Sequence, residues 1–442
     1  MNKQLVLSQN VVFAPVAAVS NKAPLAVYCS RRIGLYDGDT GLPALNINNV
    51  FVKFAQLESE INGNLVKMDE ALHIAILGLL TGDNVFLLSL PGAAKSTMAG
   101  LIGQAINGTF WRKNFTPGMD ESDIYGPVSI SALAQDRFER AWAGLATAHY
   151  ALCDEIFKAD PRTLSLLLDA VEEKKLHGAS GEYDMPLLGV ISASNELTCA
   201  NNQSAIWDRF AYRYEISRNS NPADIIALLG AMGSNAITSV KIDPEEVMLV
   251  QSYVEYMAQR LPQSILKEIG KIVKGLAGAK NCSIYPSPRR WKFFARAVWA
   301  EFMLSVVKAQ KEGVTITKEL NEKLLQKALS VGRYILWIEP EDRQAVNEVL
   351  SQAASKAYRI LVDAKSRIEK IGNDANTSDT KKAQTYMKQI GIQIENLKAI
   401  VKDTEASMEE INEASELLQK AGELQAELLA NQTNMVFSAQ QN

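Results

Sequence analysis

The segment Val85–Thr97 constrains the fold of this 442-residue chain more than any other part of it. It reads VFLLSLPGAAKST: an apolar run of strand length, a loop rich in small residues, the pair Lys95-Ser96, and the start of a helical pattern. Two later apolar runs, Tyr150–Cys153 and Leu187–Ala193, also alternate with helical stretches. Strands that alternate with helices predict a parallel sheet covered by helices on both faces.

Four regions follow one another along the chain. Residues 1–62 combine short β-prone runs with a turn-rich patch and predict an N-terminal extension. Residues 63–217 carry the strand–helix alternation and predict the α/β core, whereas residues 218–340 have only helical patterns. Residues 341–442 predict a long helical hairpin or coiled-coil arm that ends in a mobile tail.

The C-terminal region is acidic and has a clear periodicity. Its helical stretches, Glu341–Ile371 and Lys381–Leu429, flank a breaker, and apolar residues of the second mostly recur at alternating steps of three and four. Residues 341–442 hold 12 basic and 16 acidic residues, so the whole formal net charge of −4 lies there. This distribution argues against nucleic acid as a partner. The arm is either a solvated helix packed on its neighbour or a docking surface for a partner or another copy.

Composition excludes several classes of protein. With 47% hydrophobic and 22% charged residues, the chain is neither disordered nor membrane-like, and no apolar run reaches the about 20 residues that span a bilayer. Four cysteines without close pairing and only three histidines argue against a disulfide framework, a zinc module and most histidine-based catalysis. The N-terminus has no secretion signal pattern, so we expect a cytoplasmic protein.

The loop after the first strand has the chemistry of a phosphate-binding loop. Its backbone N–H groups and the helix N-terminus would surround the phosphates, the lysine would neutralise their oxygens, and the serine would ligate Mg²⁺. The pattern G-x-x-x-x-G-K-[ST] is incomplete, because Ser89 and Ala94 occupy its glycine positions. The alternative is a plain strand–turn–helix with an exposed lysine. The residues expected to bind nucleotide here are Pro91, Gly92, Ala93, Ala94, Lys95, Ser96 and Thr97.

Two later strands end in residues that complete a hydrolytic site. Asp154 and Glu155 follow an apolar strand, where the first acid would hold Mg²⁺ and the second would act as general base towards water. Acids at this position could also simply initiate a helix. Asn195 ends the next strand, and its amide could orient the attacking water.

Two arginine motifs lie further along the chain. Arg209 could reach the γ-phosphate of a neighbouring subunit, an effect that is worth roughly 10³–10⁵ in rate where it occurs. Arg289 and Arg290 follow Ser287-Pro288 at a helix start, and one of the two could point back at the nucleotide. Taken singly, each arginine is more often a surface or salt-bridge residue.

In this order of motifs the sequence resembles the AAA+ ATPases, and within them the MoxR group, especially its RavA-like members. The resemblance covers about Asn64 to Trp337. Its most specific pieces are LPGAAKS (90–96), NFTP (114–117), DIYGP (123–127), DEIFKA (154–159), ASNEL (193–197) and SPRRW (287–291).

This resemblance implies an αβα core with a five-stranded parallel sheet, an all-α lid over residues 218–340, and a ring of six subunits. It also implies ATP and Mg²⁺ as ligands, with the choice of ATP over GTP resting on the resemblance alone. A β-hairpin within 174–183 would face the pore of the ring. The implied roles are Lys95 and Ser96 as Walker A, Asp154 and Glu155 as Walker B, Asn195 as sensor 1, Arg209 as arginine finger, and Arg289 as sensor 2 with Arg290 as the alternative.

MoxR-type ATPases resemble chaperones that remodel other proteins, often with a partner that carries a von Willebrand A domain. No Asp-x-Ser-x-Ser metal motif occurs in this chain, so such a partner would be a separate protein. The leading hypothesis is therefore a Mg-dependent ATPase that moves a client protein. The alternatives are a nucleotide-binding scaffold with incidental turnover and a nucleic-acid-dependent motor of the McrB type.

Overall fold

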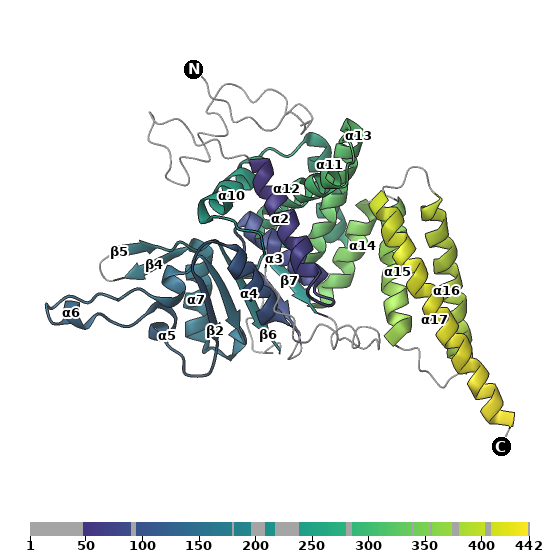
Figure 1. Cartoon of the computed structure of the whole chain (residues 1–442), viewed down its shortest axis with the longest axis horizontal. Coiled ribbons are helices and arrows are strands. Elements are labelled where there is room, and N and C mark those ends of the chain that lie inside the picture. Colours follow the sequence, from purple (N-terminus) through teal and green to yellow (C-terminus); the bar gives the residue numbers. More distant parts are fainter. Residues whose placement is uncertain are drawn as a thin grey trace. The chain divides into compact units, whose positions relative to one another are not determined.

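A computed structural model gives the fold (Figure 1). It describes residues 47–89, 94–178, 181–195, 208–216, 238–279, 285–337, 340–353, 356–373, 380–402 and 408–440. The chain forms two compact units, Met1–Val346 and Asn347–Asn442. The β-prone runs predicted within residues 1–46 and the loop residues Pro91, Gly92 and Ala93 lie outside the described residues.

Five strands of the first unit pair into one parallel sheet, as the sequence predicts. The strands β3 and β6 are buried along almost their whole length, which explains why both read as nearly continuous apolar runs. The order across the sheet is β2 (Phe110–Asn114), β3 (Tyr150–Asp154), β6 (Gly189–Ser194), β1 (Val85–Leu88) and β7 (Tyr212–Glu215).

Helices pack against this sheet. Helix α3 (Asp69–Thr81) precedes β1 and contacts β1, β6 and β7, whereas α4 (Lys95–Ala105) follows β1 and contacts β2 and β3. Side chains alternate along a strand, so Ala151 and Cys153 of β3 share one buried cluster with α7 (Pro161–Glu173). The mixed α/β fold of the prediction is therefore confirmed.

The region after residue 237 is helical in its described part. It comprises α10 (Pro244–Ala258), α11 (Gln263–Gly278), α12 (Pro288–Lys311), α13 (Lys318–Lys327) and the 3-10 turn η3 (Ala328–Tyr334). Both α10 and α12 pack on α3 and on α2 (Ile47–Asn62), whose apolar residues recur at helical spacing and are buried. The compact unit thus includes at least residues 47–62, which the sequence assigned to an N-terminal extension.

Two insertions extend from the core. The predicted hairpin is confirmed as the antiparallel pair β4 (Lys175–Gly178) and β5 (Gly181–Asp184). The other insertion lies between β2 and β3, where an arm carries α6 (Ile130–Leu133) at its tip (Figure 1). It also contains α5 (Glu121–Tyr125) and the turn η1 (Gly144–Thr147), and the turn η2 (Ile156–Lys158) follows β3. The rings of Trp142 and Tyr183 stack at 5.0 Å and link the two insertions.

The second unit differs from the predicted two-helix hairpin. After the turn η4 (Pro340–Asp342) and α14 (Arg343–Ala353), three helices pack around one apolar core: α15 (Lys356–Asn373), α16 (Thr380–Val401) and α17 (Met408–Gln440). The predicted stretch Lys381–Leu429 is thus two helices, since α16 ends at Val401 and α17 begins at Met408, and residues 403–407 lie outside the described residues. Helix α17 continues past residue 431, since no Gly or Pro follows Gly422.

Candidate active site

The carboxyl edge of the sheet gathers most of the predicted site residues. The strands β1, β3 and β6 are parallel and adjacent, so their carboxyl ends lie side by side. Helix α4 begins at Lys95 after β1, Asp154 ends β3, and Asn195 follows β6. Residues from three distant parts of the sequence therefore meet at one edge, as expected for ligand sites of parallel α/β sheets.

Lys95 stands at the start of α4, where the N-terminal N–H groups of the helix have no side-chain cap. Ala94 before it has φ +54°, the left-handed conformation that glycine adopts more easily. The Lys95 side chain is buried, and its Nζ donates a hydrogen bond to Asn195 Oδ1 at 3.1 Å. Burial lowers the pKa of Lys95, while the charges of Asp154 and Glu155 oppose this shift. An ammonium so placed, beside the first N–H groups of a helix, suits a phosphate ligand.

Ser96 and Asp154 lie together and offer oxygen ligands for a divalent cation. The Ser96 hydroxyl donates to Asp154 Oδ2 at 3.4 Å, and the other oxygen of Asp154 accepts from the Glu155 N–H at 3.2 Å. Hydroxyl and carboxylate oxygens are the ligands that Mg²⁺ prefers. This pair of oxygens therefore fits Mg²⁺.

Glu155 is buried and held in a fixed orientation. Its φ is +55°, uncommon for a residue other than glycine and often found at functional sites. Asn195 Nδ2 donates to Glu155 Oε1, and Lys158 Nζ lies 3.7 Å from Oε2. Lys95, Asn195 and Glu155 thus form one chain of hydrogen bonds across the carboxyl edge.

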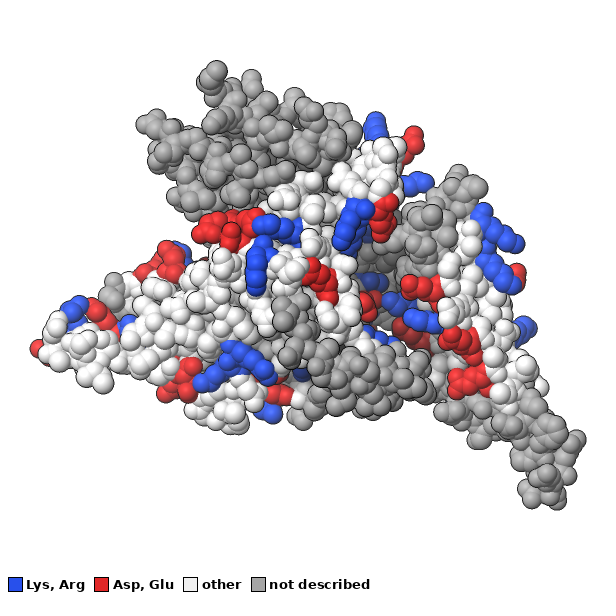
Figure 2. Space-filling view, viewed as in Figure 1, with Lys and Arg blue, Asp and Glu red and all other residues white. Residues whose placement is uncertain are grey.

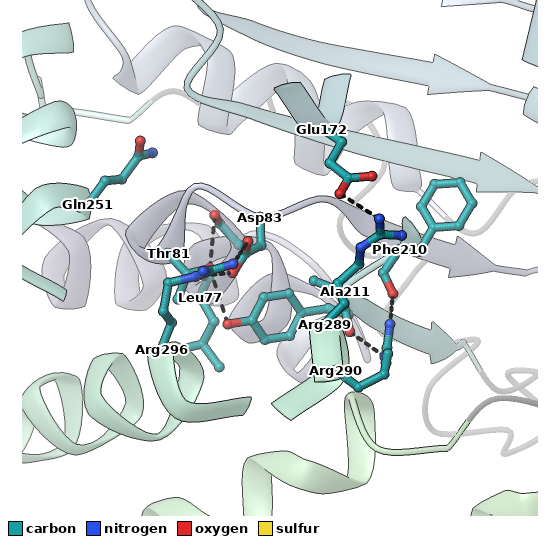
Figure 3. Close-up of polar contacts among 12 residues, drawn as sticks. Leu77, Thr81, Asp83, Glu172, Phe210, Ala211, Gln251, Arg289, Arg290 and Arg296 are labelled. Atoms are coloured by element: carbon teal, nitrogen blue, oxygen red, sulfur yellow. Dashed lines mark hydrogen bonds and ion pairs between the residues drawn. The ribbon is translucent and has the colours of Figure 1, made fainter. Parts of the chain in front are cut away.

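The two arginines predicted to contact nucleotide lie at the opposite, amino edge of the sheet. Arg209 precedes β7 and pairs with Asp169 of α7 at 2.8 Å. Arg289, in the first turn of α12, pairs with Glu172 of α7 at 3.0 Å (Figure 3). A strand of four residues, such as β1, is about 13 Å long. Lys95 follows the carboxyl end of β1, and the two arginines lie at the amino edge of the sheet. The structure therefore brings the two arginines together but separates them from Lys95 by about the length of a strand.

Arg290 is fully buried and serves the packing of this unit. Its guanidinium donates to the carbonyls of Ala211, at 2.8 Å, and Phe210 (Figure 3). It also donates to the carbonyl of Ile335 at 2.6 Å. Burial lowers the pKa of Arg290 to about 9, opposed by the charges of Asp208 and Asp83. Of the two arginines between which the sequence left a choice, only Arg289 has an accessible guanidinium, with 39% of its side chain exposed.

Sequence reasoning did not identify the acidic partners of these arginines. Asp169 and Glu172 lie on α7, whose sequence PRTLSLLLDAVEE is that of an ordinary amphipathic helix. Asp208, the other acid near Arg289, accepts a hydrogen bond from Ser287 at 2.8 Å. The pairs join residues about 40 to 120 positions apart, so no local pattern could have predicted them.

Comparison with known proteins shows which proteins this chain resembles. The family described as "MoxR domain in the MoxR-vWA-beta-propeller ternary systems" matches residues 52–251. The uncharacterized protein MJ0079 of Methanocaldococcus jannaschii is 26% identical over 342 residues, which are 76% of this chain and 83% of the relative. Chaperone MoxR1 of Mycobacterium tuberculosis is 29% identical over 127 residues, 29% of this chain and 33% of that protein.

A solved structure shows the same fold. It is a "putative ATPase" from Cytophaga hutchinsonii, with a TM-score of 0.53 and 18% identity, and the match covers 69% of this chain and 95% of that one. The two proteins therefore share an α/β fold, and in this chain the carboxyl edge of the five-stranded parallel sheet carries the candidate site. Residues 52–251 are similar to the MoxR domain, and the narrower likeness to RavA stays a prediction.

Proposed function

We propose that this chain is a Mg-dependent ATPase that converts hydrolysis into movement of a partner protein. The observation that carries the proposal is the meeting of Lys95, Ser96, Asp154, Glu155 and Asn195 at one sheet edge, in mutual contact. A nucleotide-binding scaffold would need the lysine and the helix N-terminus. It would not need the Glu155 carboxylate and the Asn195 amide to be hydrogen-bonded to each other beside that lysine.

Each side chain has a role that follows from its placement. The N-terminus of α4 and Lys95 bind the phosphates, and Ser96 with Asp154 holds Mg²⁺. When bound, Mg²⁺ neutralises negative charge on the phosphate oxygens. Glu155 accepts the proton of the attacking water, and Asn195, which already contacts Glu155, orients that water.

The arginines at the amino edge support assembly into a ring. A triphosphate at Lys95 lies across the sheet from Arg209 and Arg289, so these two side chains act on a nucleotide bound to another copy. Such a contact joins two different surfaces of identical chains, and repeating it gives a closed ring or an open filament. We propose a closed ring of six subunits, on the resemblance to AAA+ ATPases.

The proposed partner is a separate protein with a von Willebrand A domain. The matching family occurs with such proteins and with β-propellers, and one relative is named a chaperone. Basic and acidic side chains are interspersed over the visible described face (Figure 2), which suits a protein client better than nucleic acid. No described helix is long and apolar enough to cross a membrane. We place the protein in the cytoplasm. The proposed domains are an N-terminal extension (residues 1–62), the core (63–217), the lid (218–340) and a C-terminal helical arm (341–442).

The variant Glu155→Gln tests the proposal. Removing the base should lower steady-state phosphate release about 100-fold or more and leave ATP affinity within about threefold. Glu312→Gln is the matched control, because Glu312 is an exposed acid at the end of α12. Equal turnover in Glu155→Gln and the parent would refute the role of Glu155 as general base. If the assembled parent protein releases no phosphate, a nucleotide-binding scaffold is favoured. If DNA stimulates phosphate release in a salt-sensitive way, a nucleic-acid-dependent motor is favoured.

A further inference from the structure

A polar pocket opens at the amino edge of the sheet, next to the two arginines. Its volume is about 400 Å³, and it lies between the start of β1, helix α7 and the first turns of α12. Four cationic side chains and two acids line it. The cations are Arg209, Arg289, Lys292 and Arg296, and the acids are Asp83 and Glu172.

The three arginines of this pocket are already ion-paired. Arg209 pairs with Asp169, Arg289 with Glu172, and Arg296 with the buried Asp83 through two hydrogen bonds, Nε at 3.1 Å and Nη2 at 2.5 Å (Figure 3). The bidentate, buried geometry fixes Arg296 as a wall of the pocket.

Lys292 differs from these arginines. Among the described residues that line the pocket, it is the one cation without an ion pair or hydrogen bond to the protein. It lies three residues after Arg289 on α12, so both side chains project from the same face of the helix into the pocket. Its charge is therefore not neutralised by any side chain in the described part of its own subunit.

The excess positive charge selects an anion with several oxygens. One carboxylate could satisfy Lys292, but the pocket also offers Arg289 and Arg209, whose partners Glu172 and Asp169 lie at the solvent-accessible surface and can be exchanged. Phosphate oxygens suit such a set of cationic donors. The nucleotide of the same subunit cannot supply them, because it binds at the other edge of the sheet.

We propose that Lys292 binds the terminal phosphates of the nucleotide held by the neighbouring copy, together with Arg209 and Arg289. This inference rests on the proposed ATPase ring. Both arginines must leave an acid of α7 before they reach phosphate, whereas Lys292 has no partner to leave among the residues that the structure describes. Its flexible side chain therefore makes the first contact between the subunits at this site.

The first experiment compares Lys292→Met with Lys311→Met. Lys311 is an exposed lysine at the end of the same helix with no ion pair in the described structure, so it is a matched control. Loss of one charge-assisted hydrogen bond should lower phosphate release by Lys292→Met about tenfold or more. The same variant should bind ATP at its own loop as the parent does, and Lys292→Arg should retain much of the activity. Parent-like release by Lys292→Met would overturn the inference.

A mixing experiment tests whether Lys292 acts on a neighbour. Lys292→Met keeps Glu155, and Glu155→Gln keeps Lys292, so a mixed ring contains complete sites at about a quarter of its interfaces when mixing is random. The mixture should recover up to about that fraction of parental activity, although each variant alone is nearly inactive. A mixture no more active than its components would place the effect of Lys292 within its own subunit and overturn the inference.

A binding measurement keeps the inference separate from the proposed function. In Lys95→Ala protein the subunit's own phosphate loop is impaired, so inorganic triphosphate should bind mainly at the amino-edge pocket. Adding Lys292→Met to this protein should weaken triphosphate binding about tenfold, and adding Lys311→Met should not. If the parent chain hydrolyses no ATP, the proposed function fails. Unchanged triphosphate binding, in contrast, refutes the role of Lys292.

Discussion

Replacing His73 by glutamine should destabilise the first unit in a pH-dependent way. His73 of α3 lies between two carboxylates, with Nδ1 2.9 Å from Glu58 Oε1 of α2 and Nε2 2.7 Å from Glu301 Oε2 of α12. Lys308 Nζ lies 2.9 Å from the second oxygen of Glu58. One charged cluster thus joins the consecutive helices α2 and α3 to α12, which follows more than 200 residues later.

The magnitude follows from the pKa of His73. Burial alone would lower that pKa, but the charge of Glu301 and its hydrogen bond, followed by those of Glu58, raise it from 6.5 to about 9. Since one pKa unit corresponds to 1.36 kcal/mol, the charged form stabilises the folded state by about 3 kcal/mol at low pH. The difference in proton binding between the folded and unfolded states reduces this stabilisation as pH rises. About 2.5 kcal/mol of it remains at pH 7 and less than about 0.5 kcal/mol at pH 9.

The sign of the pH dependence follows from the raised pKa. Below the unfolded pKa of 6.5 both states bind the proton, and the stabilisation is complete. Between pH 6.5 and 9 only the folded state keeps it, so the free energy of unfolding falls as pH rises. In His73→Gln this contribution is absent at every pH.

Urea denaturation followed by tryptophan fluorescence measures the effect. All six tryptophans lie within residues 1–346, so the signal reports the first unit and not the C-terminal helices. We expect His73→Gln to lose about 2–3 kcal/mol at pH 7 and under about 1 kcal/mol at pH 9. His177→Gln is the control, because His177 is 65% exposed on the hairpin. An equal loss at both pH values would refute the charged-cluster explanation.

Two further predictions concern residues around α12. Arg290→Met should lower the free energy of unfolding by about 3 kcal/mol or more, because it removes the side-chain donor of the Phe210 and Ala211 carbonyls and one of the two donors of the Ile335 carbonyl. Arg289→Met should change it by less than about 1 kcal/mol. Equal urea midpoints for the two variants would contradict these roles. Glu172→Gln releases Arg289 from an accessible ion pair, so it should leave stability nearly unchanged and raise phosphate release up to about fivefold. A fall in phosphate release would show that Glu172 positions Arg289 rather than restraining it.

Local patterns were enough to predict that certain side chains meet at the carboxyl edge of the sheet. Lys95, Asp154 and Asn195 each follow an apolar run that becomes a buried strand, and in a parallel sheet the ends of such strands must share an edge. The hydrogen bonds from Lys95 to Asn195 and from Asn195 to Glu155 needed the coordinates, because they join residues 100 and 40 positions apart.

Helix packing was predicted less well. The 3- and 4-residue steps identified helices in the C-terminal region, but they could not tell two long helices from three shorter ones around a common core. The burial of α2 against α10 and α12 was missed because residues 1–62 were interpreted as a whole from their first, turn-rich part.

The sequence alone determined the class of protein: a strand, a small-residue loop and Lys95-Ser96 predict a phosphate-binding α/β core whatever surrounds them. Only the tertiary structure decided what the arginines do. Arg289 and Arg290 are neighbours in sequence, yet Arg289 lines an open pocket, whereas Arg290 is buried and donates hydrogen bonds to backbone carbonyls. Consecutive residues of a helix point about 100° apart, so the packing around α12, and not the motif itself, separates an arginine that lines a pocket from a buried one.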